Sequence, residues 1–118
     1  MTEEDYNQSE QNASCGCFAG PLRSLANGQY LGMDESFAEV SLLACPACGQ
    51  RWLRYFYEVE AFTASGRWYL GAITAEQAAL MTAAQAKTAL EGLGWYFYGG
   101  SYYGGRSGRT SGRIYLNP

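Results

Sequence analysis

Four cysteines, arranged as two close pairs, constrain this chain more than any other feature. Cys15 and Cys17 flank a glycine, and Cys45 and Cys48 lie in the run Cys45-Pro46-Ala47-Cys48-Gly49. The chain contains no histidine. Two thiolates close in sequence can bind one ion, and a second pair completes a tetrahedral set. The pattern therefore predicts one structural metal ion, with zinc preferred to iron because a purely structural role needs no redox chemistry.

The second pair has the local chemistry of a metal-binding turn. Pro46 restricts φ and removes a backbone donor, and Gly49 can adopt the left-handed conformation that directs N–H groups at the Cys45 sulfur. The run resembles the knuckle of zinc ribbons and rubredoxins, and the resemblance implies a metal-binding turn. The pair Cys15 and Cys17 departs from that pattern, because both halves of those proteins usually carry Cys-x2-Cys.

Two other interpretations of the cysteines stay open. Cys-Pro-x-Cys at a helix N-terminus is the redox motif of glutaredoxins, but here the residues after Cys48 predict a strand and no βαβ pattern follows. Two disulfides would suit an exported protein, but the first residues lack the basic and apolar regions of a secretory signal. We therefore expect a cytoplasmic protein of bacterial type, where paired cysteines bind metal more often than they form static disulfides.

Length and charge narrow the class of protein. With 118 residues, we expect a single zinc-stapled domain over residues 15–118. Residues 1–14 are polar and acidic and predict a disordered tail, because they hold too little apolar surface to compensate for ordering. The net charge of −3 disfavours nucleic acid as a partner. Since no apolar run reaches about 18 residues, no membrane span is expected.

Alternation of apolar residues at period two predicts a sheet. The clearest strand covers residues 50–62, with Leu53, Tyr55 and Tyr57 on the face that we expect to be buried. A four-residue turn at residues 63–66 then predicts an antiparallel hairpin. Further strands are predicted at residues 29–31, 37–44, 67–73, 95–98 and 114–116.

Two capping boxes predict the helical part of the chain. Thr74 with Gln77 is one box, and Thr82 with Gln85 is the other. An alanine and leucine stripe fits one continuous helix over residues 75–91, whereas the paired caps favour two short helices. The fold class is therefore α+β: a small antiparallel β-sheet with one or two short helices packed on one face. A zinc-ribbon-like knuckle of four cysteines would staple the N-terminal loop to this sheet.

The segment 99–112 is rich in glycine, tyrosine and arginine and predicts a loop that is flexible or ordered only by contacts. The candidate partner-binding residues are Tyr102, Tyr103, Arg106, Arg109 and Arg113. Tyrosine and arginine are enriched at protein-interface hot spots, and the same pair serves single-stranded nucleic acid by stacking and phosphate contact. The acidic net charge favours a protein partner. Exposed aromatics leave both a monomer and a homodimer open.

The sequence offers little for catalysis. Without histidine and with Lys87 as its one lysine, the chain lacks the usual bases of nucleophilic catalysis. We therefore expect no enzyme. The favoured hypothesis is a protein-interaction module acting as an accessory, inhibitor or immunity-type factor. The alternative is a nucleic-acid-binding zinc-ribbon-like module that uses the C-terminal tyrosines and arginines.

Overall fold

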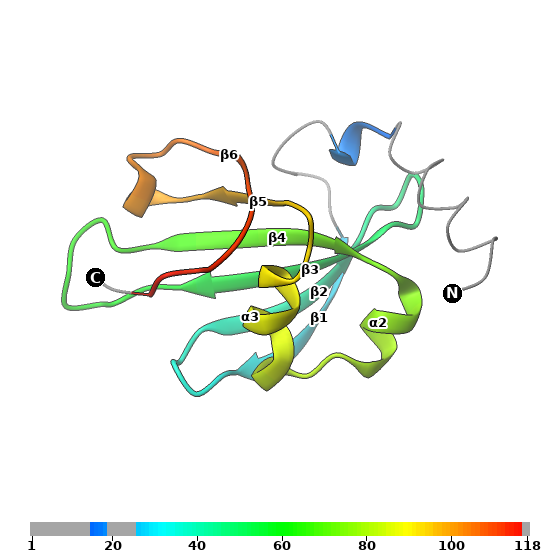
Figure 1. The fold of residues 1–118 in the computed structure, drawn as a ribbon, viewed down its shortest axis with the longest axis horizontal. Coiled ribbons are helices and arrows are strands. Elements are labelled where there is room, and N and C mark those ends of the chain that lie inside the picture. The colour runs from blue at the N-terminus through cyan, green and yellow to red at the C-terminus, as the bar shows by residue number, and fades with distance from the viewer. Residues whose placement is uncertain (1–14, 19–25, 117–118) are drawn as a thin grey trace.

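The computed structural model describes residues 15–18 and 26–116, and the acidic tail predicted for residues 1–14 lies outside this part. Within these ranges, the strands form one six-stranded antiparallel sheet in chain order (Figure 1). The strands are β1 (Ala26–Met33), β2 (Glu39–Ala44), β3 (Arg51–Tyr57), β4 (Arg67–Ile73), β5 (Tyr96–Gly99) and β6 (Gly108–Thr110). The helices α2 (Ala75–Leu80) and α3 (Ala83–Glu91) connect β4 to β5, and the short 3-10 helices are η1 (Gly16–Phe18) and η2 (Ser101–Tyr103).

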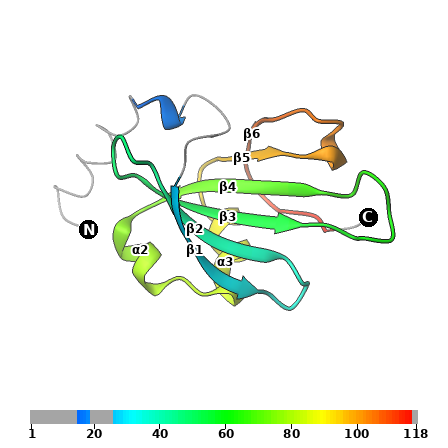
Figure 2. The same cartoon turned by 180° about the vertical axis from the view of Figure 1, so that it is seen from behind.

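Both helices lie on the same face of the sheet, and Figure 2 shows the face that they leave open. This arrangement confirms the predicted α+β class. It also confirms two helices rather than one, because the chain is extended at Met81 and Thr82 between them. Thr74 forms the predicted capping box with Gln77. Thr82 is the N-cap residue of α3, but its side chain makes no capping hydrogen bond.

The two faces of the sheet bury different sets of side chains. Strand alternation sends Leu53 and Tyr55 of β3 toward the helices, and both are fully buried, as predicted. The strand was predicted to reach residue 62, but β3 ends at Tyr57. On the opposite face Trp52 is also fully buried, in a cluster with Leu70 and Phe97. A sheet with apolar residues on both faces needs cover on both. The helices cover one face. On the other face, aromatic side chains, among them Phe18 and Trp95, pack over Trp52.

The prediction for the N-terminal side of the sheet was too short. The sequence indicated a strand at residues 29–31, whereas β1 covers eight residues and pairs with β2. The register of this pairing shifts between Ala26 and Gln29 and again between Tyr30 and Gly32. Each irregularity inverts the facing of the residues that follow it. The period-two pattern that identifies a strand is therefore lost in β1.

The prediction of a last strand at residues 114–116 was wrong. The last strand is β6, which lies inside the glycine-rich segment that was predicted to be a loop. Ile114 is buried in the main core, but its backbone N–H donates to Glu91 Oε2 at 2.8 Å. A side-chain carboxylate on α3 therefore takes the hydrogen bond that a neighbouring strand would have taken.

Glu91 joins the helical layer to the C-terminal segment. Its carboxylate accepts from Ile114 N–H and from Lys87 Nζ, the latter at 2.9 Å. Burial acts to raise the pKa of Glu91, but these two donors outweigh it, and the pKa is lowered from its ordinary value of 4.5. A carboxyl group whose pKa is lower in the folded than in the unfolded state stabilises the fold above its unfolded pKa. This contribution is lost as the pH falls through the folded value.

Replacing this carboxyl group should change how stability depends on pH. We expect Glu91→Gln to lower the free energy of unfolding at pH 7 by about 1–2 kcal/mol, the value of a hydrogen bond to a charged group. The loss of stability between about pH 5 and pH 3 should also be less steep in this variant. Urea denaturation at a series of pH values measures both effects. Glu76→Gln, on the exposed first turn of α2, is the matched control, and an unchanged pH slope in Glu91→Gln would contradict the assignment.

Candidate metal centre

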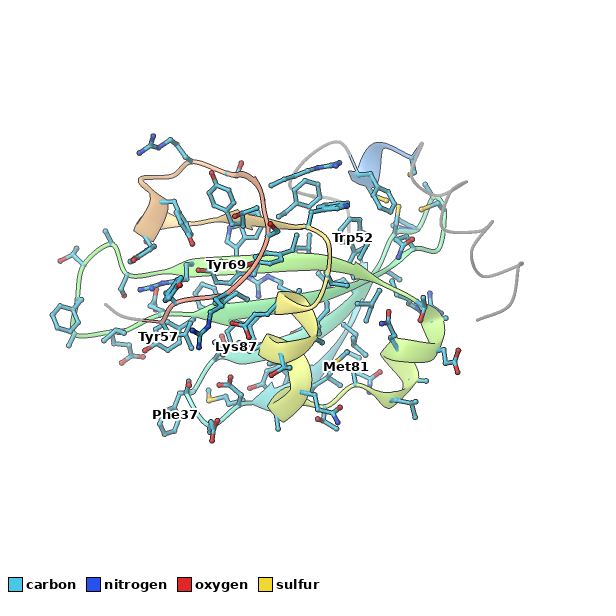
Figure 3. All side chains as sticks on the ribbon, viewed as in Figure 1. Phe37, Trp52, Tyr57, Tyr69, Met81 and Lys87 are labelled. Atoms are coloured by element: carbon cyan, nitrogen blue, oxygen red, sulfur yellow. The ribbon has the colours of Figure 1, made fainter. Side chains whose placement is uncertain are left out.

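The two cysteine pairs, which are far apart in sequence, meet at one end of the sheet. Cys15 and Cys17 lie at η1, and Cys45 and Cys48 lie in the turn between β2 and β3. All four Sγ atoms lie within 4.8 Å of one another. Figure 3 shows sulfur atoms, in yellow, between η1 and this turn. The predicted set of four ligands is therefore brought together by the fold.

The spacing of the sulfurs fits a tetrahedral ion. A zinc–sulfur bond of about 2.3 Å places two ligands of a tetrahedron about 3.8 Å apart. Cys15 Sγ lies 3.9 Å from Cys45 Sγ, and Cys17 Sγ lies 3.6 Å from Cys48 Sγ. All four cysteines are free rather than disulfide-bonded. The four side chains could therefore hold one metal ion, since their number, chemistry and spacing all match.

The β2–β3 turn is shaped to present Cys45. Cys45 N–H donates to Gln50 O at 2.9 Å, and Gly49 N–H donates to Cys45 O at 2.7 Å. Gly49 has φ of +78°, the left-handed conformation that the sequence predicted for it. Burial acts to raise the pKa of Cys45, but the backbone N–H groups of Cys48 and Ala47 lower it, to about 7. The turn thus supplies the N–H···S contacts expected of a metal-binding knuckle.

The thiols of Cys17 and Cys48 favour the protonated state. Burial raises the pKa of Cys17, and hydrogen bonding with Cys48 raises it further. The pKa of Cys48 is also raised, chiefly by burial, although the backbone of Gln50 acts against this. Four thiolates this close together would repel one another in the absence of a cation. A bound divalent ion would supply the charge that stabilises them.

An aromatic cluster holds the metal centre against the open face of the sheet. The ring of Phe18, the last residue of η1, lies 5.0 Å from the ring of Trp52 and 6.0 Å from that of Trp95. The Arg109 guanidinium lies 4.0 Å above the Trp95 ring, and its Nη2 donates to Phe18 O. Residues from η1, β3 and β6 therefore form one contact, which connects the two ends of the described chain.

The structure separates the predicted partner-binding residues. Arg109 belongs to the aromatic cluster beside the metal centre, whereas Tyr102, Tyr103 and Arg113 line a cavity of about 370 Å³. Arg106 is exposed and donates from Nε to Tyr103 O at 3.4 Å. The other residues that line the cavity are Tyr69, Tyr96, Thr110, Ser111, Ile114 and Tyr115.

Hydrogen bonds and ring contacts order the tyrosines of this cavity. The hydroxyls of Tyr69 and Tyr103 lie 2.8 Å apart, and Tyr96 OH donates to Gly112 O at 2.7 Å. Burial and the bond to Tyr103 raise the pKa of Tyr69. The ring of Tyr102 lies 3.6 Å from the guanidinium carbon of the buried Arg67. Sequence reasoning missed the inward-facing Tyr69 and Tyr96, because their strands gave no reason to connect them with the glycine-rich segment.

No protein-family model matches this chain, and no curated protein or solved structure matches it either. In the part of the chain that the structure describes, no helix is long and apolar enough to cross a membrane.

Removing one sulfur should abolish metal binding. We expect Cys45→Ser to lower the metal content from one ion per chain to a small fraction of that, because a hydroxyl is a poor replacement for a thiolate ligand. Elemental analysis of purified protein measures the loss. Ala47→Ser, an exposed change in the same turn, is the matched control and should keep the metal. A wild-type protein that is fully folded yet free of metal would contradict the assignment.

Proposed function

We propose that the chain is a non-enzymatic structural-zinc protein that serves as a protein-interaction module. The observation that carries the proposal is the cluster of four sulfurs, which joins η1 to the turn between β2 and β3. Zinc is the proposed ion, and iron is less favoured, because a d¹⁰ ion suits a tetrahedral thiolate site without any redox role.

The donor set supports a structural rather than a catalytic role. Four thiolates fill a tetrahedral coordination sphere, whereas catalytic zinc sites keep one position open for water or substrate. The lone lysine is also engaged, since Lys87 forms an ion pair with Glu91. These features support a function based on binding, with the metal as a clamp.

The tyrosine-lined cavity is the proposed contact surface for a protein partner. Arg113 is exposed at its edge, and Tyr102 and Tyr103 are half-buried in its wall. Aromatic rings held in place by neighbours lose little entropy when they bind, and arginine and tyrosine are frequent hot-spot residues. A cavity of this size could accept one side chain of a partner. An accessory, inhibitor or immunity-type role would be consistent with such a surface.

Removing the metal tests the clamp itself. Structural zinc contributes on the order of 10 kcal/mol to folding. We therefore expect a strong chelator to release one ion per chain and to expose the aromatic cluster around Trp52. Tryptophan fluorescence and elemental analysis, recorded together, should show both changes, and re-addition of zinc should reverse them. Release of metal without any change in fluorescence would argue against a clamping role.

Charge reversal at the cavity edge tests the interaction surface. We expect Arg113→Glu to reduce capture of a native protein partner by roughly tenfold, the loss typical of a hot-spot residue. Affinity capture with the metal-loaded chain, quantified by mass spectrometry, measures this. Arg51→Glu is the matched control, because Arg51 is exposed on β3 and does not line this cavity.

The same variants distinguish the alternative of nucleic-acid binding. Single-stranded DNA or RNA would bind wild type in a salt-dependent manner and would bind Arg113→Glu more weakly. If the chain binds single-stranded nucleic acid in this way and captures no protein in an Arg113-dependent manner, nucleic-acid binding would replace the proposed function. Equal capture of all proteins by wild type and Arg113→Glu would also contradict the proposed surface.

A further inference from the structure

The turn between β1 and β2 presents an aromatic ring to solvent. The Phe37 side chain is 78% exposed, more than any other large hydrophobic side chain in the described ranges. Figure 3 shows the ring projecting from the turn, away from the sheet. Met33, the last residue of β1, is 53% exposed. Burying such a ring costs little in conformational entropy if the turn is already rigid.

Asp34 makes this turn rigid. Its Oδ1 accepts from the backbone N–H groups of Ser36, at 2.9 Å, and of Ala38, at 3.0 Å. Its Oδ2 accepts from the hydroxyl of Tyr55, a fully buried residue of β3. These bonds hold Phe37 at φ of +66°, a left-handed conformation that an aromatic residue rarely adopts. The exposed ring is thus anchored to the core through one carboxylate.

A cavity lined by apolar side chains and by an acidic rim of three exposed glutamates includes the exposed ring. Its volume is about 170 Å³. The cavity lies on the face of the sheet that has no helices. Phe56 is on this face because its neighbour Tyr55 points to the helices, and Glu39 and Trp68 share the face as the cross-strand partners of Phe56. The residues that line it are the apolar Met33, Phe37 and Phe56 and the acidic Glu39, Glu58 and Glu60.

The negative charge of this rim is largely uncompensated within the described part of the chain. Among the described residues, the ion pair is formed by Lys87 and Glu91, and neither Glu58 nor Glu60 takes part in one. The Arg54 guanidinium lies 5.2 Å from the Phe56 ring and interacts with Glu39, so it offsets part of this charge. Glu35, in the same turn as Phe37, is exposed and adds to the negative charge. The rim is therefore electrostatically complementary to a cation.

We propose that this cavity, called the acidic groove, is a docking site for a basic, partly apolar segment of another protein. The residues that form the groove are Met33, Phe37, Glu39, Phe56, Glu58 and Glu60. An apolar side chain of that segment packs against Phe37 and Phe56. A lysine or arginine next to it pairs with Glu58 and Glu60. This surface is separate from the tyrosine-lined cavity around Arg113, so the inference goes beyond the proposed function and does not depend on it.

Selection from a random peptide library tests the chemistry of the occupant. The metal-loaded full chain is immobilised and panned against peptides displayed on phage. We expect the selected peptides to be enriched in lysine or arginine next to an apolar residue. Enrichment of acidic sequences, or no enrichment at all, would overturn the proposal.

Variants locate the binding site of the best selected peptide. Fluorescence anisotropy should show roughly tenfold weaker binding for Phe37→Ser, the loss typical of a hot-spot residue. The double variant Glu58→Gln/Glu60→Gln should bind more weakly and with less dependence on salt. Leu80→Ser and Glu76→Gln, both exposed on α2, are the matched controls and should bind as wild type does. Unchanged affinity in Phe37→Ser, with its fold verified by circular dichroism, would overturn the site.

A second copy of this chain is the competing occupant, because Arg106 and Arg113 are exposed and basic. Sedimentation velocity distinguishes the two cases. Self-association that disappears in both Phe37→Ser and Arg113→Glu would overturn the proposal of a different partner, whereas a monomer supports it. Loss of peptide binding in Phe37→Ser but not in Arg113→Glu supports this groove even if the cavity around Arg113 proves to have no partner.

Discussion

The contact between η1 and the β2–β3 turn is the constraint on which the open face of the sheet depends. The sulfurs of four cysteines meet there within 4.8 Å, and Phe18 packs beside Trp52 in the same contact. A chain of this size buries a modest core, and its sheet carries large apolar side chains on both faces. Helices cover one face only. The other face contains Trp52, which is fully buried and packs against Phe18, Trp95 and Phe97.

Arg109 extends this contact to β6, the edge strand opposite β1 in the sheet. Its guanidinium stacks on Trp95 and donates to Phe18 O, so the last strand supports the segment that carries the first cysteine pair. Stacking on an aromatic face suits arginine, which is planar and weakly hydrated. The four cysteines that could hold a metal ion are therefore bordered by an aromatic and cationic shell. This shell links η1 to β6 through Phe18 and Arg109.

The surfaces proposed for binding share one physical property, which is order in the absence of a partner. Tyr69, Tyr96 and Tyr103 hold one another or the backbone through their hydroxyls. Asp34 holds the turn that displays Phe37 through bonds to the backbone and to Tyr55. Side chains that are ordered beforehand lose less entropy on association. The two surfaces carry opposite charges, since Arg113 lines the tyrosine-lined cavity and three glutamates line the acidic groove beside Phe37. The two surfaces therefore suit partners of opposite charge.

The sequence by itself determined the features that depend on local chemistry. Cysteine spacing and the turn residues indicated a four-thiolate centre, because ligand pairs must lie close in sequence to reach one ion. Alternation within the strand predicted for residues 50–62 indicated that Leu53 and Tyr55 are buried, and the capping box at Thr74 marked the start of α2. These signals are readable because each cysteine pair, each strand face and each helix cap depends on residues within a few positions of one another.

Only the tertiary structure decided the features that depend on distant residues. Bulges removed the alternation from β1, and Glu91 took the backbone hydrogen bond that would have made residue 114 part of a strand. The bond from Arg109 to Phe18 joins residues 91 positions apart. Phe37 owes its display to a carboxylate held by the buried Tyr55. No local pattern encodes such pairings, because they form only when the sheet brings the two groups together.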